Sequence, residues 1–173
     1  IYILSSGKIN AQEREEYLNR MKEAAQDLSS LLEDVLAVSR VQAGMTLPQR
    51  QTVELAPLLK SLIHTQEPVA SEKGLSLKCE VPEELCAYAD PKLLRRIVNN
   101  LLSNAIKFTA QGGIEVKAWE DEKQTFLSVK DSGIGLTEKA CQEIFEKYRQ
   151  VDERAEGYGL GLFISRQLAH AHG

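Results

Sequence analysis

The sequence has no long apolar run and no excess of positive charge. Its uncharged apolar stretches fall far short of the roughly 20 residues that a membrane-spanning helix needs, and the opening segment IYILSSGKIN lacks the basic start and long apolar centre of a signal peptide. With 27% charged residues and a net charge of −4, the chain also lacks the broad basic field that holds nucleic acid. We expect a soluble chain that does not bind nucleic acid and meets a membrane only through regions outside these residues.

Cysteine is scarce as well. The three cysteines, Cys79, Cys86 and Cys141, form no C-x-x-C pair and no group with histidines, which argues against a zinc site and a disulfide framework. We interpret them as reduced, small apolar residues of a cytoplasmic protein. A chain of 173 residues with 43% hydrophobic content has room for one core and at most a small appended element.

The first forty-odd residues carry a wide apolar stripe at helical spacing. Its members are Leu18, Met21, Ala24, Ala25, Leu28, Leu31, Leu32, Val35 and Val38. The pattern predicts a helix from about Ala11 that stops at Gly44, before Pro48. Because the stripe is too wide for a lone surface helix, we expect a helical bundle, and IYIL resembles the end of a preceding helix.

The remaining sequence alternates between strand and helix patterns. The expected elements are a helix over 53–74 that is broken near Pro68, a strand over 75–81, a helix over 91–108, a hairpin that turns at 120–123, and a last helix from Gly161. Asp90 and Pro91 supply the cap and first residue of the third of these elements. The expected fold class is α+β, with helices on one side of a mixed or antiparallel sheet and a helical hairpin in front.

The segment DSGIGL, residues 131–136, directly follows a predicted strand. A carboxylate fixed at a strand end, as Asp131 would be, accepts a hydrogen bond from an exocyclic amine such as that of adenine. Glycines at 133 and 135 let a flat ring approach the backbone. The segment therefore suits a purine, although Asp-Ser-Gly at a strand end is also common as a plain turn.

A second glycine group, EGYGLGLF, places Gly157, Gly159 and Gly161 before a helix. Backbone N–H groups exposed at a helix N-terminus form an anion site suited to phosphates. A flexible loop is the alternative. The group is neither a Walker motif, since no G-K-[ST] follows, nor a dinucleotide motif, since no strand directly precedes it.

The helix NNLLSNAIKF places polar side chains on one face. Asn100 and Asn104 lie four residues apart, and Lys107 lies three further along. Asn104 can offer an oxygen to Mg²⁺, and Lys107 can neutralise phosphate charge. The alternative is a solvated face whose asparagines cap neighbouring loops.

Together and in this order, these motifs resemble those of the sensor histidine kinases of two-component signalling, within the ATPase group that also holds gyrase and mismatch-repair ATPases. NNLLSNAIKFT is similar to the family's N box, DSGIGL to its first glycine box, IFEKYRQVD to its phenylalanine-centred box, and GYGLGL to its second glycine box. Residues 11–44 resemble the second helix of the dimerisation hairpin. The resemblance implies a two-layer α/β sandwich, with a mixed sheet packed on helices, that binds ATP beneath a mobile lid between the glycine boxes.

The resemblance also implies roles for single residues. Asn104 would be the Mg²⁺ ligand, and Asn100 and Lys107 would be the catalytic residues near the phosphates. Phe108 would border the nucleotide and Asp131 would hold the adenine amine. The remaining nucleotide contacts would come from Gly133 and Gly135 at the adenine, and from Gly157, Gly159, Leu160, Gly161 and Leu162 at the phosphates.

The family's acceptor histidine is missing from this sequence. In the family it stands in a first-helix motif in which an acidic residue follows the histidine. His64, His170 and His172 lie elsewhere. The acceptor is therefore expected upstream of Ile1, and the chain alone is expected not to phosphorylate itself.

Two further departures concern the lid and the C-terminal end. The family continues past Gly173 with two strands that complete the sheet. The lid segment DERAE is shorter than usual, and Gln150 stands where many members have an arginine, for which Arg149 is the candidate substitute.

The domains expected are 1–46, a partial dimerisation and phosphotransfer segment without the acceptor histidine, and 52–173, an ATP-binding catalytic domain. The implied function is transfer of the ATP γ-phosphoryl group to a histidine and then to an aspartate of a response-regulator receiver domain, in a homodimer held by a helical bundle. One alternative is a clamp-type ATPase of the same fold, which needs a catalytic acid where Asn100 stands. The other is a catalytically degenerate sensor that binds ATP as a scaffold.

Overall fold

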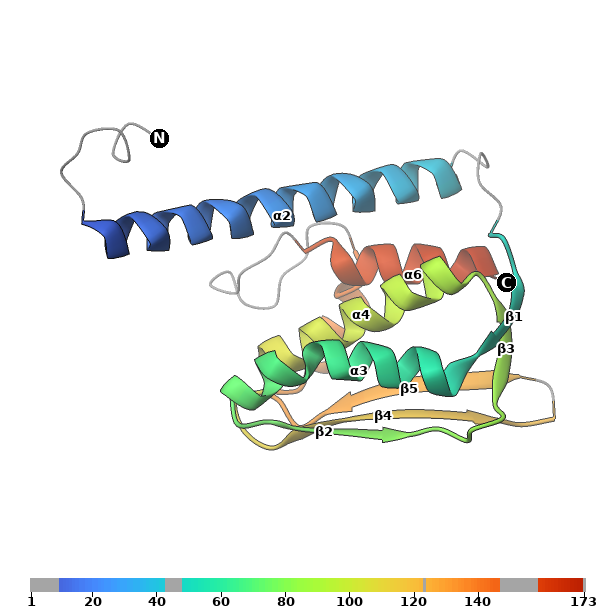
Figure 1. The fold of residues 1–173 in the computed structure, drawn as a ribbon. Helices are drawn as coiled ribbons and strands as arrows, with labels where there is room; N and C mark the ends of the chain where they lie inside the picture. Colours follow the sequence, from blue (N-terminus) through green and yellow to red (C-terminus); the bar gives the residue numbers. More distant parts are fainter. Residues whose placement is uncertain (1–9, 43–47, 123, 147–158, 173) are drawn as a thin grey trace.

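A long helix lies beside a layered α/β domain in the computed structural model, which describes residues 10–42, 48–122, 124–146 and 159–172 (Figure 1). The elements in order are α2 (Ala11–Gln42), β1 (Gln51–Glu54), α3 (Leu55–Glu72), β2 (Ser76–Glu80), β3 (Cys86–Ala89), α4 (Pro91–Phe108), β4 (Gly113–Glu120), β5 (Thr125–Asp131), α5 (Glu138–Glu143) and α6 (Gly161–His172). The predicted helices over 91–108 and from Gly161, and the predicted hairpin, are confirmed.

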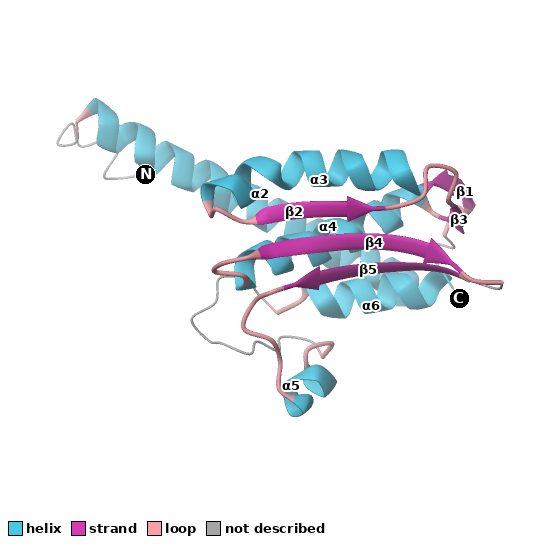
Figure 2. Ribbon diagram, turned by 90° about the horizontal axis from the view of Figure 1, so that it is seen from below, coloured by secondary structure: helices cyan, strands magenta, loops and turns pink. Residues whose placement is uncertain are grey.

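The main sheet is mixed and has the strand order β2-β4-β5. β2 runs parallel to β4, and β4 pairs with β5 in an antiparallel hairpin that places Ile114 opposite Asp131. β1 and β3 form a separate antiparallel pair at one end of the domain (Figure 2). The helices lie on one face of the main sheet, which confirms the predicted α+β class.

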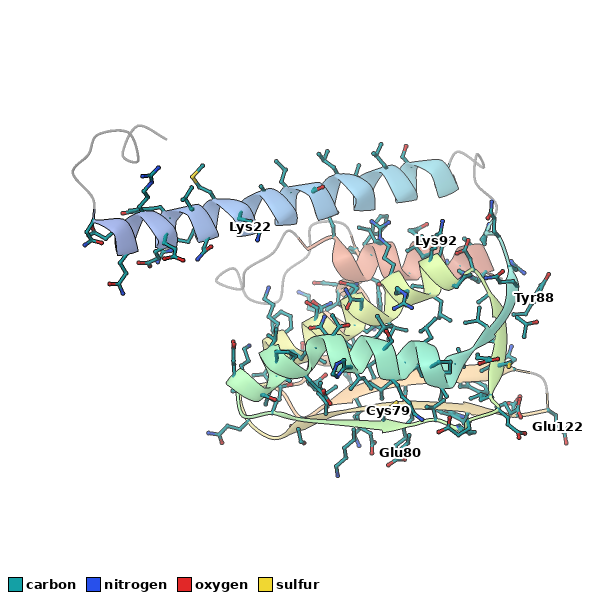
Figure 3. All side chains as sticks on the ribbon, in the orientation of Figure 1. Lys22, Cys79, Glu80, Tyr88, Lys92 and Glu122 are labelled. Atoms are coloured by element: carbon teal, nitrogen blue, oxygen red, sulfur yellow. The ribbon has the colours of Figure 1, made fainter. Side chains whose placement is uncertain are left out.

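The two faces of the sheet differ in burial because side chains alternate along each strand. In β4, Ile114, Val116 and Ala118 are buried beneath α3 and α4, whereas Lys117 lies on the outer face. There the Lys117 ammonium pairs with Glu80 at 2.9 Å, and Glu80 points away from the helices in Figure 3. The core therefore fills the space between the sheet and the helices.

All three cysteines are free thiols. Cys79 and Cys86 are half-buried, whereas Cys141 is exposed. Cys141 therefore does not pack as the small apolar residue that the sequence predicted. Cys79 packs against the core, where burial raises the pKa of its thiol.

The predicted break near Pro68 is wrong, because α3 continues through this residue to Glu72. Proline removes one backbone donor from a helix. Here Pro68 lies on the exposed side, while Ile63 before it and Ala70 after it are buried in the core. Packing on both sides of the proline therefore holds the helix together. The sequence also gave no indication of β1, β3 or α5, which have four, four and six residues.

α2 lies along α6 and keeps much of its apolar surface exposed (Figure 1). Leu28 and Leu32 are each 57% exposed, and Leu18, Met21 and Val35 are also exposed. The side chains of Leu31 and Val38 lie outside the described residues. None of the helices in the described ranges is long and apolar enough to cross a membrane.

Asp90 caps α4 and fastens it to two other segments. Its Oδ1 accepts hydrogen bonds from the N–H groups of Lys92 at 2.9 Å and Leu93 at 3.3 Å, which confirms the predicted cap. Its Oδ2 accepts the N–H of Gln49 at 2.9 Å, and its own N–H donates to Nε2 of His172 at 3.1 Å. One residue thus joins the start of α4 to the segment before β1 and to the end of α6.

The ionisation of Asp90 stabilises this joint. Desolvation by burial acts to raise the pKa of Asp90, but the hydrogen bonds from three backbone N–H groups outweigh it, and the pKa lies below its ordinary value of 3.8. The folded protein therefore binds fewer protons at this site than the unfolded chain does. The resulting stability is fully present above pH 3.8 and is lost as the pH falls through the folded-state pKa.

We expect Asp90→Ala to lower the free energy of unfolding by about 1–2 kcal/mol at neutral pH, the usual cost of losing a helix cap. Urea unfolding followed by circular dichroism measures this difference. The difference in unfolding free energy between parent and variant should narrow as the pH falls below 3.8 and through the folded-state pKa, because the unfolded chain takes up the proton first. Asp90→Asn is the matched control, because asparagine still caps a helix but does not titrate. A difference in unfolding free energy between Asp90→Ala and the parent that stays constant from neutral to acid pH would contradict the role given to the Asp90 charge.

Candidate functional site

Asn100 joins α4 to the first turns of α6. Its side-chain Nδ2 donates a hydrogen bond to Oγ of Ser165 at 2.7 Å. A Cβ on Gly161 would meet Oδ1 of Asn100, so this side chain lies directly against the glycine and would have to shift for any larger residue. The fold therefore brings the N-box helix and the second glycine segment together.

The second glycine segment leads directly into α6. Gly159 has a φ of +66°, in the left-handed region that favours glycine. Leu160 packs against the buried pair Ile164 and Leu168, which fixes the start of the helix. Gly161 and Leu162 are half-buried in the first turn of α6, the end of a helix at which backbone N–H groups lack partners within the helix itself. Gly157, Arg149, Gln150 and the DERAE segment lie outside the described residues.

Asn104 and Lys107 follow Asn100 along α4 and are half-buried. The side chain of Asn104 makes no hydrogen bond to the described part of the chain, so its amide is available to a ligand. The Lys107 ammonium lies 5.1 Å from the centre of the Phe108 ring, a cation–π distance. The predicted polar face of α4 is thus present and accessible.

Phe108 ends α4 against the first glycine segment. A Cβ on Gly133 would clash with the backbone carbonyl oxygen of Phe108, so glycine is required for this contact. Oδ1 of Asp131 accepts the N–H of Gly133 at 2.9 Å, and the Asp131 side chain is exposed. Gly135 has a φ of +67°. The loop thereby holds the Asp131 carboxylate beside the end of α4.

Ser132 fixes the other side of this loop. Its Oγ accepts the N–H of Gly113 at 3.0 Å and lies 3.1 Å from the carbonyl oxygen of Gln111. Its own N–H donates to the carbonyl of Gly113 at 3.2 Å. The turn after Asp131 is therefore tied to the start of β4 as well as to α4. These hydrogen bonds are those of a plain turn, the alternative interpretation of DSGIGL. They do not use Oδ2 of Asp131, which makes no hydrogen bond to the described residues.

An open cavity of about 450 Å³ lies between the end of α4 and this loop. Its lining consists of Lys73, Lys107, Phe108, Thr109, Ala110 and Ile134. Lys73 was not a candidate from the sequence, because it stands in the turn after α3 without a motif around it. Its ammonium donates to the carbonyl of Ile106 at 3.0 Å, and only the packing of α3 against α4 brings it here.

The described residues contain no group of three or more His, Cys, Asp or Glu side chains that could hold a metal ion. Magnesium commonly binds through one or two protein oxygens, with water and substrate phosphates as its other ligands. The accessible amide of Asn104 fits such a site. The predicted metal site therefore depends on phosphate oxygens for most of its ligands.

Comparison with known proteins points to one group of ATPases. Residues 89–173 match the family model described as "Histidine kinase-, DNA gyrase B-, and HSP90-like ATPase". The chain is 33% identical over 175 residues to the circadian input-output histidine kinase CikA of Synechococcus elongatus, covering 96% of this chain and 23% of CikA. It is 32% identical over 173 residues to the signal transduction histidine-protein kinase BarA of Escherichia coli (strain K12), covering 91% of this chain and 18% of BarA. The chain thus spans less than a quarter of each of these relatives.

Solved structures have a similar fold. The crystal structure of full-length ShkA in complex with AMPPNP matches with a TM-score of 0.77 and 32% identity, over 97% of this chain and 36% of that chain. The Acinetobacter baumannii histidine kinase AdeS matches with a TM-score of 0.77 over 98% of this chain and 78% of that chain. At 18% identity, the likeness to AdeS shows the fold alone.

We expect Gly133→Ala to lower the free energy of unfolding by about 1–3 kcal/mol, because the added methyl group meets a backbone carbonyl that cannot move away cheaply. Gly161→Ala is the matched control: its methyl group meets the side chain of Asn100, which can shift, and alanine favours the helix. Urea unfolding should therefore show a smaller loss for Gly161→Ala. Equal stability of Gly133→Ala and the parent would show that the loop does not press on Phe108.

Proposed function

We propose that the chain is the ATP-binding catalytic part of a two-component sensor histidine kinase, because residues 89–173 match the family model of histidine kinase-, DNA gyrase B- and HSP90-like ATPases. The observation that carries this proposal is that α4 contacts both glycine segments. Asn100 lies against Gly161, and the Phe108 carbonyl lies against Gly133. At 1.5 Å per residue these two contacts are about 12 Å apart along the helix, a span suited to a nucleoside triphosphate.

The nucleotide would bind with its base at the first glycine segment and its phosphates at the second. Oδ2 of Asp131 would accept a hydrogen bond from the adenine amine, beside the face of Phe108. The backbone N–H groups at the start of α6 would bind phosphate oxygens, as helix N-termini do for anions. Lys107 lies between these ends on α4, where its ammonium would neutralise phosphate charge.

Mg²⁺ would be held by the amide oxygen of Asn104 together with phosphate oxygens, and when bound it would neutralise the charge that develops on the phosphates. The chain's own contribution is positioning. Phosphoryl transfer needs an aligned acceptor and charge stabilisation more than covalent help from the enzyme. Asn100 and Lys107 would supply these from one face of α4.

Transfer to an imidazole is favoured over hydrolysis by the residues around Asn100. A clamp-type ATPase needs a group that takes a proton from water. Asn100 has no such basicity, and its amide nitrogen already donates to Ser165. An acceptor imidazole brings its own nucleophilic nitrogen and needs no base at this position.

The acceptor histidine would come from outside the described part of the chain. None of the described residues of α2 is a histidine. His64 is exposed on α3, where it pairs with Glu67 at 3.0 Å. His170 and His172 stand at the end of α6 that is remote from Gly161. The nearer of them, His170, is about 13 Å along the helix from that end of the site.

Residues 1–46 would form part of a dimerisation bundle and 52–173 the catalytic domain. The exposed leucines of α2 support this division, since a lone helix rarely leaves such a stripe in water. A second copy of the chain would cover the stripe in a homodimer. The response-regulator receiver domain that takes the phosphoryl group would dock on the same bundle.

If the site binds adenine through Asp131, we expect ATP to bind much more tightly than GTP. Guanine presents a carbonyl where adenine has its amine, and two acceptors would then face each other. Asp131→Asn should weaken ATP binding by about 1–3 kcal/mol, a typical loss for a hydrogen bond to a charged group. Asp121→Asn is the control, because Asp121 is an exposed carboxylate on the far β4–β5 turn. Calorimetry with non-hydrolysable analogues measures the affinity of the parent for both nucleotides and that of each variant for the ATP analogue.

Equal affinity for the two nucleotides would contradict the adenine contact. Phosphate release from ATP by the chain alone separates the alternatives, because a kinase without its acceptor should release phosphate very slowly. Rapid release would favour the clamp-type ATPase. Tight ATP binding without transfer to the protein's own upstream histidine segment would favour the scaffold.

A further inference from the structure

A buried hydroxyl lies between α4 and α6. Among the side chains that the structure describes, Thr109 and Ser165 are the two buried polar ones, at 1% and 6% exposure. Thr109 bonds within its own helix, to the carbonyl of Ala105 at 2.7 Å. Ser165 instead accepts a hydrogen bond from another helix, through Nδ2 of Asn100. Its hydroxyl therefore links α6 to α4, a contact that helix formation alone does not require.

Gly161 and Ser165 act on opposite ends of the same amide. They lie four residues apart and so share one face of α6. Ser165 Oγ accepts from the nitrogen end of the Asn100 amide, and the oxygen end lies over Gly161, where a Cβ would clash. A reversed amide would turn Oδ1 toward Ser165, whose hydroxyl would then have to rotate and donate, and would turn Nδ2 toward Gly161.

Packing by itself does not explain the serine. Alanine would fill nearly the same space beside Ile164 and Leu168 and has the higher helix propensity. What the hydroxyl adds, and alanine could not, is a hydrogen-bond partner for the Asn100 amide in the orientation that the structure shows. A neighbouring asparagine shows the contrast, because Asn99 is exposed and its Oδ1 accepts from Gln66 on α3 at 2.9 Å.

We infer that Ser165 is a positioning residue that holds the Asn100 amide with its oxygen toward the first turn of α6, and that this orientation favours the metal-bound form of the nucleotide. The inference rests on the proposed function. An amide oxygen at that place repels bare phosphate but accepts a hydrogen bond from water bound to a cation. The reversed amide would present N–H groups and would favour phosphate without the metal.

The test compares AMPPNP binding with Mg²⁺ and with EDTA, by calorimetry on the whole chain. Ser165→Ala should weaken binding of Mg·AMPPNP by roughly three- to tenfold, the effect of one hydrogen bond. Its affinity for metal-free AMPPNP should stay the same or rise. Ser103→Ala is the matched control, because it removes an exposed hydroxyl from α4 and should change neither affinity.

A double-mutant cycle separates positioning from packing. If Ser165 acts through Asn100, Ser165→Ala should have no further effect in an Asn100→Ala background. The inference would be overturned if Ser165→Ala lowered the affinity for Mg·AMPPNP equally in the parent and in Asn100→Ala. It would also be overturned if Ser165→Ala lowered AMPPNP affinity equally with and without Mg²⁺. Should Ser165→Ala fold poorly, Ser165→Cys keeps the shape with a weaker acceptor and should give an intermediate Mg²⁺ preference. A cysteine variant with the full parental preference would likewise overturn it.

A measurement without ligand keeps this inference separate from the proposed function. In the free protein, NMR should show the side-chain N–H₂ of Asn100 protected from exchange, and Ser165→Ala should remove that protection. A parent chain that binds no nucleotide would sink the proposed function, and the metal preference with it. A parent that binds Mg·AMPPNP and is unaffected by Ser165→Ala would sink the inference alone.

Discussion

The site depends on close contact between α4 and two glycines from distant parts of the chain. Gly133 lies against the backbone carbonyl of Phe108, and Gly161 lies against the side chain of Asn100. A side chain at Gly133 would push its segment away from the helix, and one at Gly161 would displace the Asn100 side chain. Because both contacts involve the C-terminal half of one rigid helix, the distance between the two glycine segments is set by the helix itself.

The rest of the fold keeps α4 in place for these contacts. Its apolar side packs on the sheet and α3 through buried residues such as Val98 and Leu102, while Leu93 and Ile97 pack against α6. Its N-terminus is fastened by Asp90 to Gln49 and His172, and Arg50 donates to the carbonyl of Ala171 at 3.1 Å. The segment that follows α2 therefore contacts both helices of the site at their far ends.

Sequence alone predicted α4 to the residue, because a capping aspartate, a proline at the first position and a strong apolar period all agree. The family resemblance also predicted that Asn100, Gly133 and Gly161 belong to one nucleotide site, and in the structure α4 contacts both glycines. Lys73 and Ser165 escaped notice, since each acquires its role only from a neighbour more than thirty residues away. The continuous helix at Pro68 was missed for a related reason: burial on both sides outweighs a local rule.

Amide hydrogen exchange with and without Mg·AMPPNP tests most directly whether α4 and both glycine segments form one nucleotide site. Binding should slow exchange at 131–136, at 159–163 and in the second half of α4 together. The β1–β3 pair, at the opposite end of the domain, should exchange as before and serves as the internal control. Protection confined to one glycine segment, or absent from α4, would contradict the proposed site.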